Sequence, residues 1–279
     1  MEKLDRLGWA AGLTFTSYGV RVGVRTNDPS VLDRVRAAWP PGSRAARHRR
    51  VDRLFSLTVG GHDPMRNLRR FHLLYAESQQ LARSLELDDV MAALETDLQL
   101  HVAEFAPRRV FVHAGVVGWR GRAILLPGAS HAGKSTLVAA LLRAGATYYS
   151  DEYAVLDLSG RVHPYARDPQ LRGDDDRTRP VPLATLGSAP AGRRPLPVGL
   201  VAVARYRAGA HWRPRRISAG QGALDLLAHT VPARFRPDRA LAALRRVVAQ
   251  APAWKGTRGE AEQTVAWLLE TAEREGGGG

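Results

Sequence analysis

The segment 123–142 constrains the fold of this chain more than any other part of the sequence. It reads as a buried strand, a glycine-bounded loop and an amphipathic helix. The loop matches the pattern G-x-x-x-x-G-K-[ST], with Gly128, Gly133, Lys134 and Ser135 in register. Glycines let backbone N–H groups converge on an anion, and the helix that follows adds the positive end of its dipole. We therefore predict a nucleotide-phosphate site, and favour it over an ordinary strand–turn–helix with a surface lysine.

Residues of the loop and of the first helical turn are expected to bind the phosphates and the metal ion. Lys134 can reach the β- and γ-phosphates of a nucleotide, and the Ser135 hydroxyl can be a ligand of Mg²⁺. The predicted cofactors are therefore ATP and Mg²⁺. The predicted nucleotide-binding residues in this stretch are Gly128, Ala129, Ser130, His131, Ala132, Gly133, Lys134, Ser135 and Thr136.

Paired carboxylates follow the loop after a single helix, which Gly145 is expected to end. The segment 147–156 is predicted to be one strand with Asp151 and Glu152 at its middle. Successive strand residues point to opposite faces, so we expect the two acids to have different tasks. One would hold Mg²⁺, and the other would take a proton from an acceptor hydroxyl. A solvated Asp-Glu pair is the alternative, which we favour less beside a phosphate-binding loop.

Composition limits the class of protein. The chain has 279 residues, no cysteine and a formal net charge of +14. Without cysteine, disulfides and Cys-ligated metals are excluded. No stretch has the features of a signal peptide or a membrane span, so we expect a soluble cytoplasmic protein with no membrane partner. The positive charge is compatible with a nucleic acid, an acidic partner or an anionic ligand.

The densest basic run is Arg44–Arg50. It could be a patch for an acidic peptide or a nucleic acid. It has no interleaved aromatic residues and no recognisable nucleic-acid-binding motif, so we favour a solvated loop and do not expect a nucleic-acid partner.

The periodicity of the rest of the chain predicts alternating strands and helices in two regions. We expect an N-terminal α+β region over 1–104, a nucleotide-binding domain over 105–275 and a disordered tail over 276–279. The predicted strands are 13–26 with a turn at Gly19, 51–59, 109–117, 123–126, 198–203 and one within 254–260. The other predicted helices are 30–39, 66–104, 218–228, 237–249 and 260–274.

The order His113-Ala114-Gly115, phosphate-binding loop, Ser150-Asp151-Glu152 resembles the HPr serine kinase/phosphorylase-like family. The resemblance covers about residues 108–172. It implies an α/β P-loop nucleotide-binding fold of the HPr kinase/phosphoenolpyruvate carboxykinase type, with a smaller α+β region before it. By this resemblance His113, Lys134 and Asp151 are catalytic, with Asp151 the acid/base group. The implied metal ligands are Ser135, Asp151 and Glu152, the last standing where the family has a second aspartate.

The chain departs from the family pattern after the acidic pair. The family's Glu-Ile-Arg-Gly-Leu-Gly-type signature is missing, and Val162–Arg172 follows instead. Within it, Arg167 or Arg172 could supply a cation to the transferred phosphate, or each could be a surface arginine. Arg172 is included among the predicted nucleotide-binding residues, as is Arg258 in its Gly-x-Arg-Gly setting.

Together these features predict an ATP- and Mg²⁺-dependent kinase that transfers the γ-phosphate to a hydroxyl, chiefly a serine of a peptide or protein. The resemblance to HPr-kinase-like proteins beside peptide-modifying gene clusters suggests a ribosomal peptide as acceptor. Two alternatives stay open: an ATP-binding switch module without acceptor turnover, and a carboxykinase-like metabolic enzyme. The sequence names neither the acceptor nor any phosphorylase activity, and it is compatible with a homo-oligomer.

Overall fold

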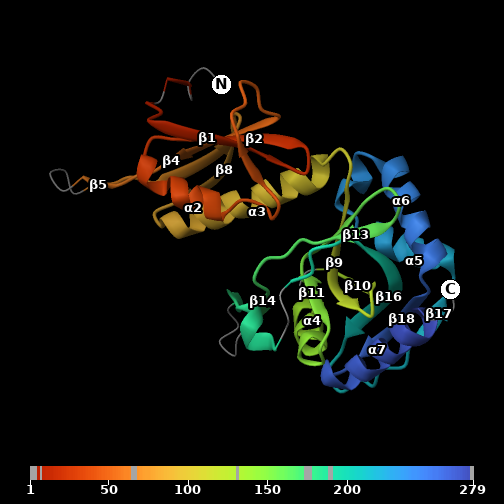
Figure 1. Ribbon diagram of the computed structural model, residues 1–279. Coiled ribbons are helices and arrows are strands. Elements are labelled where there is room, and N and C mark those ends of the chain that lie inside the picture. Colours follow the sequence, from red (N-terminus) through yellow and green to blue (C-terminus); the bar gives the residue numbers. More distant parts are fainter. Residues whose placement is uncertain are drawn as a thin grey trace. The chain divides into compact units, whose positions relative to one another are not determined.

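The chain divides into two compact units, Met1–Pro107 and Arg108–Gly279, each with its own sheet (Figure 1). The computed structural model describes residues 5–6, 8–63, 68–129, 132–172, 178–187 and 191–276. Both units mix helices with mixed sheets, which confirms the expected α/β class at that level. Gly276 is the last residue of a helix, and the rest of the predicted tail lies outside the described residues. None of the helices in the described ranges is long and apolar enough to cross a bilayer.

The first unit is built on a six-stranded sheet in the order β3-β1-β2-β4-β7-β8. Alternate strand residues such as Phe15, Val22 and Phe55 are fully buried, as expected for a sheet with one face in the core. The elements of this unit are β1 (Ala11–Ser17), β2 (Val20–Thr26), η1 (Pro29–Val31), α2 (Leu32–Ala37), β3 (Arg44–Ala46), β4 (Arg53–Thr58), β5 (His62–Asp63), β6 (Leu68–Arg69), β7 (His72–Ala76), β8 (Gln79–Ser84) and α3 (Leu87–Phe105).

Two expectations for this unit are wrong. The predicted helix over 66–104 is helical only from Leu87, because the residues before it form β6, β7 and β8. There β7 pairs with both β4 and β8, and Glu77 turns the hairpin with φ +54°. The leucines of that stretch are spaced ambiguously, and the sheet pairing decides their conformation. The basic run is not wholly a loop either, since Arg44–Ala46 pairs with β1.

The second unit is organised around β10, the strand that enters the glycine-bounded loop. β10 pairs antiparallel with β9 and parallel with β16, and the pairings β9–β12, β12–β13 and β13–β16 close the ring. The strands of this unit are β9 (Val110–Trp119), β10 (Arg122–Pro127), β11 (Thr147–Ser150), β12 (Tyr153–Leu156), β13 (Arg161–His163), β14 (Gln170–Arg172), β15 (Thr178–Pro180), β16 (Leu196–Tyr206), β17 (Arg215–Ile217) and β18 (Ala253–Arg258).

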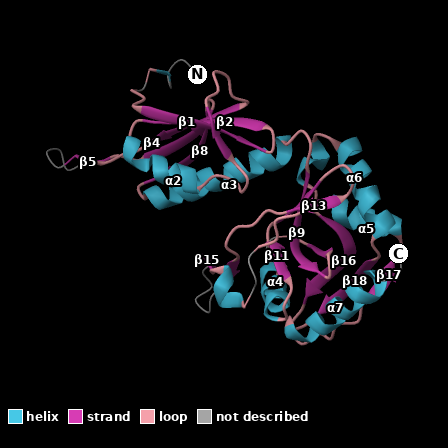
Figure 2. Cartoon of the chain, in the orientation of Figure 1, coloured by secondary structure: helices cyan, strands magenta, loops and turns pink. Residues whose placement is uncertain are grey.

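Helices cover both faces of this sheet (Figure 2). One apolar cluster joins the sheet to α5 (Ala219–Leu227) and α6 (Pro237–Gln250), and the other joins it to α4 (Lys134–Arg143) and α7 (Glu262–Gly276). Gly115 of β9 permits close approach of α4, because a Cβ there would lie 2.6 Å from Val138 Cγ2. Apart from 66–86, the predicted strands and helices occur in their expected order, with shifted ends.

The strand predicted over 147–156 is interrupted. β11 ends at Ser150 and β12 begins at Tyr153, so Asp151 and Glu152 lie in a bend between them. Ser150 Oγ forms the bend by accepting hydrogen bonds from the N–H groups of Glu152 (3.1 Å) and Tyr153 (2.9 Å). Both strands pair with β9, and the Ala114 N–H still donates to the Glu152 carbonyl at 3.1 Å. The acids are therefore held against β9 without being regular strand residues.

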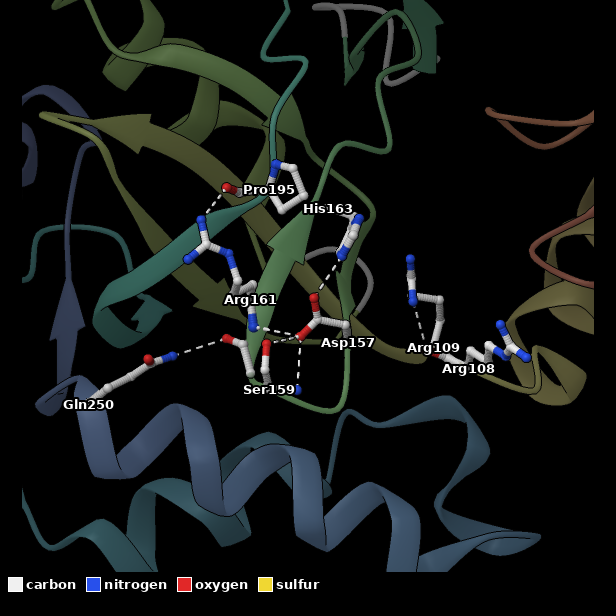
Figure 3. Close-up of polar contacts among 9 residues, drawn as sticks. Arg108, Arg109, Asp157, Ser159, Arg161, His163, Pro195 and Gln250 are labelled. Carbon is white, nitrogen blue, oxygen red and sulfur yellow. Dashed lines mark hydrogen bonds and ion pairs between the residues drawn. The ribbon is translucent and has the colours of Figure 1, made fainter.

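Asp157 closes the hairpin between β12 and β13 (Figure 3). Its Oδ1 accepts hydrogen bonds from Ser159 N (2.9 Å), Ser159 Oγ (2.6 Å) and Arg161 N (3.1 Å), and its Oδ2 lies 2.8 Å from His163 Nε2. Partial burial alone would raise the pKa of Asp157, but these hydrogen bonds outweigh it and lower the pKa to about 2. The charged carboxylate therefore stabilises the turn.

Replacing Asp157 with alanine is expected to lower the free energy of unfolding at pH 7 by about 1–3 kcal/mol, because the turn loses hydrogen bonds to a charged acceptor. A carboxylate with a lowered pKa stabilises the fold above its unfolded pKa of about 3.9, and this contribution disappears as the pH falls toward 2. Urea unfolding at pH 7 and pH 2.5 measures both effects. Asp168→Ala, at an exposed residue, is the control; equal losses from both variants at pH 7 would contradict the assignment.

Candidate functional site

The glycine-bounded loop connects the end of β10 to the start of α4. Gly133 is the N-cap of α4 and has φ +75°, a left-handed conformation that favours glycine. Lys134 Nζ donates to the carbonyl groups of Gly128 (2.9 Å) and Ala129 (2.7 Å), so the ammonium group folds back over the loop. Two predicted ligands, Ser130 and His131, lie outside the described residues.

The charge of Lys134 is influenced by burial and by the two acids. Burial lowers the pKa of Lys134, whereas Asp151 and Glu152 raise it. The next residue, Ser135, contacts Asp151 directly at 3.0 Å. The structure thus brings the lysine of the loop and the predicted acids into one site.

Asp151 is fixed by three hydrogen-bond donors. Ser135 Oγ donates to Asp151 Oδ2 at 3.0 Å, and the Gln170 N–H donates to the same oxygen at 3.0 Å. Tyr148 OH donates to Oδ1 at 2.8 Å. The aspartate is 8% exposed, and burial together with its charge raises the pKa of Tyr148. Asp151 is therefore a buried, rigidly held carboxylate that contacts the first turn of α4.

Glu152 has a different environment. Its side chain is 39% exposed, and Oε2 lies 3.7 Å from Arg167 Nη1. Desolvation and the neighbouring charge of Asp151 raise the pKa of Glu152 to about 7, against the opposing effect of Lys134. Glu152 is thus a carboxyl group that can exchange a proton near neutral pH, next to a carboxylate whose two oxygens are already engaged.

His113 connects the loop with a segment that the sequence did not point to. Its carbonyl accepts from the Gly128 N–H at 3.2 Å, and its own N–H donates to the carbonyl of His229 at 2.8 Å. The His113 ring packs against the ring of Tyr153, with centroids 4.6 Å apart. Burial, Lys134 and His229 lower the pKa of His113, so its imidazole is neutral at pH 7.

His229 follows α5 and, like Tyr148 and Gln170, is a residue of the candidate site that the sequence did not indicate. Burial, then Lys134 and Lys255, lower the pKa of His229, against an opposing effect of Asp225. Its neighbour Thr230 forms an isolated β-bridge with Val112 of β9. The contact between the segment 229–230 and β9 joins residues far apart in the sequence, and no spacing in the sequence predicts it.

The remaining predicted ligands differ in what they contact. Arg258 is 2% exposed and uses two guanidinium N–H groups within the protein, from Nη2 to the Gly133 carbonyl (2.7 Å) and from Nη1 to the Gly259 carbonyl (2.8 Å). It therefore contacts the backbone of the loop. The Ala132 N–H donates to the Ala129 carbonyl, and Thr136 is exposed on the first turn of α4. The Arg172 side chain lies outside the described part of the chain.

The side-chain oxygen atoms of Ser135 and Asp151 suit a magnesium ion that also binds a phosphate ligand. Across the described ranges, no group of three or more His, Cys, Asp or Glu side chains is placed to hold a metal. The Ser135 hydroxyl and the Asp151 carboxylate are hard oxygen donors in direct contact. Mg²⁺ commonly binds one or two such groups and completes its coordination with water and substrate phosphates.

Comparisons with known proteins do not assign a family to this chain. The sequence matches no protein-family model, and a search of curated proteins finds no match for it. The site is therefore described by its geometry alone. It lies in a mixed α/β unit, where a glycine-bounded loop leads into the N-terminus of a helix and two carboxylates lie next to that helix. The resemblance to the HPr kinase family stays a prediction.

Proposed function

We propose that the unit Arg108–Gly279 is an ATP- and Mg²⁺-dependent phosphotransferase with a P-loop fold of the HPr kinase/carboxykinase type. Its acceptor is a hydroxyl, chiefly a serine of a peptide or protein, and it acts in the cytoplasm. One observation carries the proposal. The 3.0 Å hydrogen bond between Ser135 and Asp151 joins the helix after the loop to the acidic bend, so that both oxygens can serve one Mg²⁺.

The loop residues hold the phosphates in this account. Backbone N–H groups and the N-terminus of α4 bind the anionic oxygens, and Lys134 adds a positive charge above them. Lys134 must leave the carbonyl groups of Gly128 and Ala129 to do so. Bound Mg-ATP supplies the phosphoryl group, which the acceptor oxygen takes as ADP departs. Positioning and charge neutralisation supply most of the catalysis in such reactions.

We assign the general base to Glu152 and the metal-holding role to Asp151. The resemblance instead makes Asp151 the acid/base group and places both acids among the metal ligands. The geometry favours Glu152 as the base because Asp151 already accepts three hydrogen bonds, including one from Ser135. Glu152 is more exposed, and its pKa of about 7 suits a group that removes the acceptor's hydroxyl proton at neutral pH.

A histidine and an arginine side chain are proposed to act near the hydroxyl that accepts the phosphoryl group. Neutral His113 can accept or donate a hydrogen bond and so orient the acceptor hydroxyl next to Glu152. Arg167, 3.7 Å from Glu152, can contribute positive charge to the transferred phosphoryl group.

Transfer of label from [γ-³²P]ATP into serine-containing peptides and HPr-type carrier proteins tests this function. We expect label in at least one acceptor in the presence of Mg²⁺, and none with a Lys134→Ala variant. ATP binding without transfer to any acceptor would support the switch module instead. Transfer of phosphate to a small oxyacid, with no peptide labelling, would support a carboxykinase-like enzyme.

A further inference from the structure

Three parallel strands end at the same edge of the second unit. β16 pairs in parallel with β10 on one side and with β18 on the other. β10 leads into the glycine-bounded loop, β16 ends at Tyr206 and β18 ends at Arg258, which lies opposite Tyr206 in the register. Arg258 at the end of β18 donates to the Gly133 carbonyl at 2.7 Å, so the ends of β16 and β18 adjoin the proposed phosphate site.

Tyr206 lies directly beside the last residue of the loop. A Cβ placed on Gly133 would be 3.7 Å from Tyr206 Cβ. Tyr206 is nevertheless 43% exposed, although it packs beside the buried Arg258. The ring is thus accessible within one side-chain length of the loop.

Two contacts fix the orientation of this ring. The Arg258 guanidinium carbon lies 5.3 Å from the ring centroid, and Tyr206 OH donates to Glu260 Oε1 at 3.1 Å. Arg258 is itself anchored to the Gly133 carbonyl. The ring, the arginine and the loop therefore form one connected unit.

We propose that Tyr206 is the platform on which the base of the bound nucleotide stacks, with the Glu260 carboxylate beside it to accept hydrogen bonds from the ribose or from an exocyclic amino group. This inference rests on the proposed function, because it needs a nucleotide whose phosphates occupy the loop. Aromatic stacking is tolerant of base identity, and removing one platform weakens binding roughly ten- to hundredfold. Tyr206 would then distinguish a nucleotide from a bare polyphosphate.

The test compares two ligands that share phosphates but not a base. The dissociation constants of ATP and inorganic tripolyphosphate are measured by calorimetry, with Mg²⁺ and the full chain. The wild-type protein is expected to bind ATP more tightly than tripolyphosphate. Tyr206→Ala should weaken ATP binding roughly tenfold or more, with tripolyphosphate binding changed by less than about twofold. Tyr206→Phe keeps the ring and should bind ATP as the wild type does.

The possible results separate this inference from the function on which it rests. Equal losses for both ligands in Tyr206→Ala, or no loss for either, would overturn the stacking platform, while binding of tripolyphosphate by the wild type would still support the phosphate site. Failure of the wild type to bind either ligand would overturn both proposals. Should the alanine variant fail to fold, as judged by its thermal melt, Tyr206→Leu keeps an apolar side chain under Arg258 and gives the same comparison.

Discussion

Replacing Glu152 with glutamine is expected to lower the rate of phosphoryl transfer roughly 10²- to 10⁴-fold, the usual contribution of a general base. Glutamine has nearly the same size and keeps an oxygen atom beside Arg167, but it cannot take a proton. The affinity for Mg-ATP should therefore stay within about threefold, because the loop and Asp151 are unchanged. Single-turnover transfer and equilibrium binding measure the two quantities separately.

The pH dependence gives the same prediction an independent check. Because the pKa of Glu152 is about 7, the group is protonated and inactive as a base below that pH, and the wild-type rate should rise as the pH passes through about 7. The Glu152→Gln variant should lack this rise. Glu262→Gln, at a carboxylate 3.9 Å from Arg143, is the matched control and should behave as the wild type does. A Glu152→Gln variant with wild-type turnover and the same pH profile would show that another group is the base.

Replacing Asp151 with asparagine is expected to remove the magnesium dependence of ATP binding. In the wild type, Mg²⁺ should strengthen ATP binding through Ser135 and Asp151; in the variant, added Mg²⁺ should have little effect, and transfer should fall at least as far as in Glu152→Gln. The variant should also lose about 1–3 kcal/mol of stability, since the donors that surround Asp151 lose a charged acceptor.

Tyr148→Phe separates the structural part of this effect from the metal-binding part. It removes the donor to Oδ1 and leaves the contact between Ser135 and Asp151 in place. We expect reduced stability with retained magnesium dependence. Retained magnesium dependence in Asp151→Asn itself would contradict the role assigned to this carboxylate.

The sequence locates the strand and the helix around the loop, and the role of the loop as a site stays a prediction. The strand, the glycine-bounded loop and the helix are contiguous, so the motif and the apolar periodicity around it are enough to locate β10 and α4. Gly133 adopts the left-handed conformation for which a glycine is suited. A single helix separates the loop from the acidic bend, and Ser135 and Asp151 meet at 3.0 Å although β11 and β12 pair with β9 and not with β10.

The parts that depend on tertiary contacts could not be predicted. Ser150 bends the chain at the acids, which alternation along a regular strand does not anticipate. The Gln170 donor to Asp151 and the approach of His229 come from segments that meet only in the folded unit. The sequence predicts a helix across the hairpin of β7 and β8 because Leu74, Leu81 and Leu85 have helical spacing, and only the pairing with β4 makes β7 a strand.

Binding of ATP to the full-length protein and to Lys134→Ala, measured by calorimetry with Mg²⁺ at pH 7.5, tests the central claim most directly. The account predicts one ATP per chain, and an affinity lowered roughly 10- to 100-fold in the variant, as expected for the loss of a charged contact to phosphate. Equal affinity in the two proteins, or no binding to the wild type, would contradict the claim that the loop from Gly128 to Ser135 binds nucleotide phosphates.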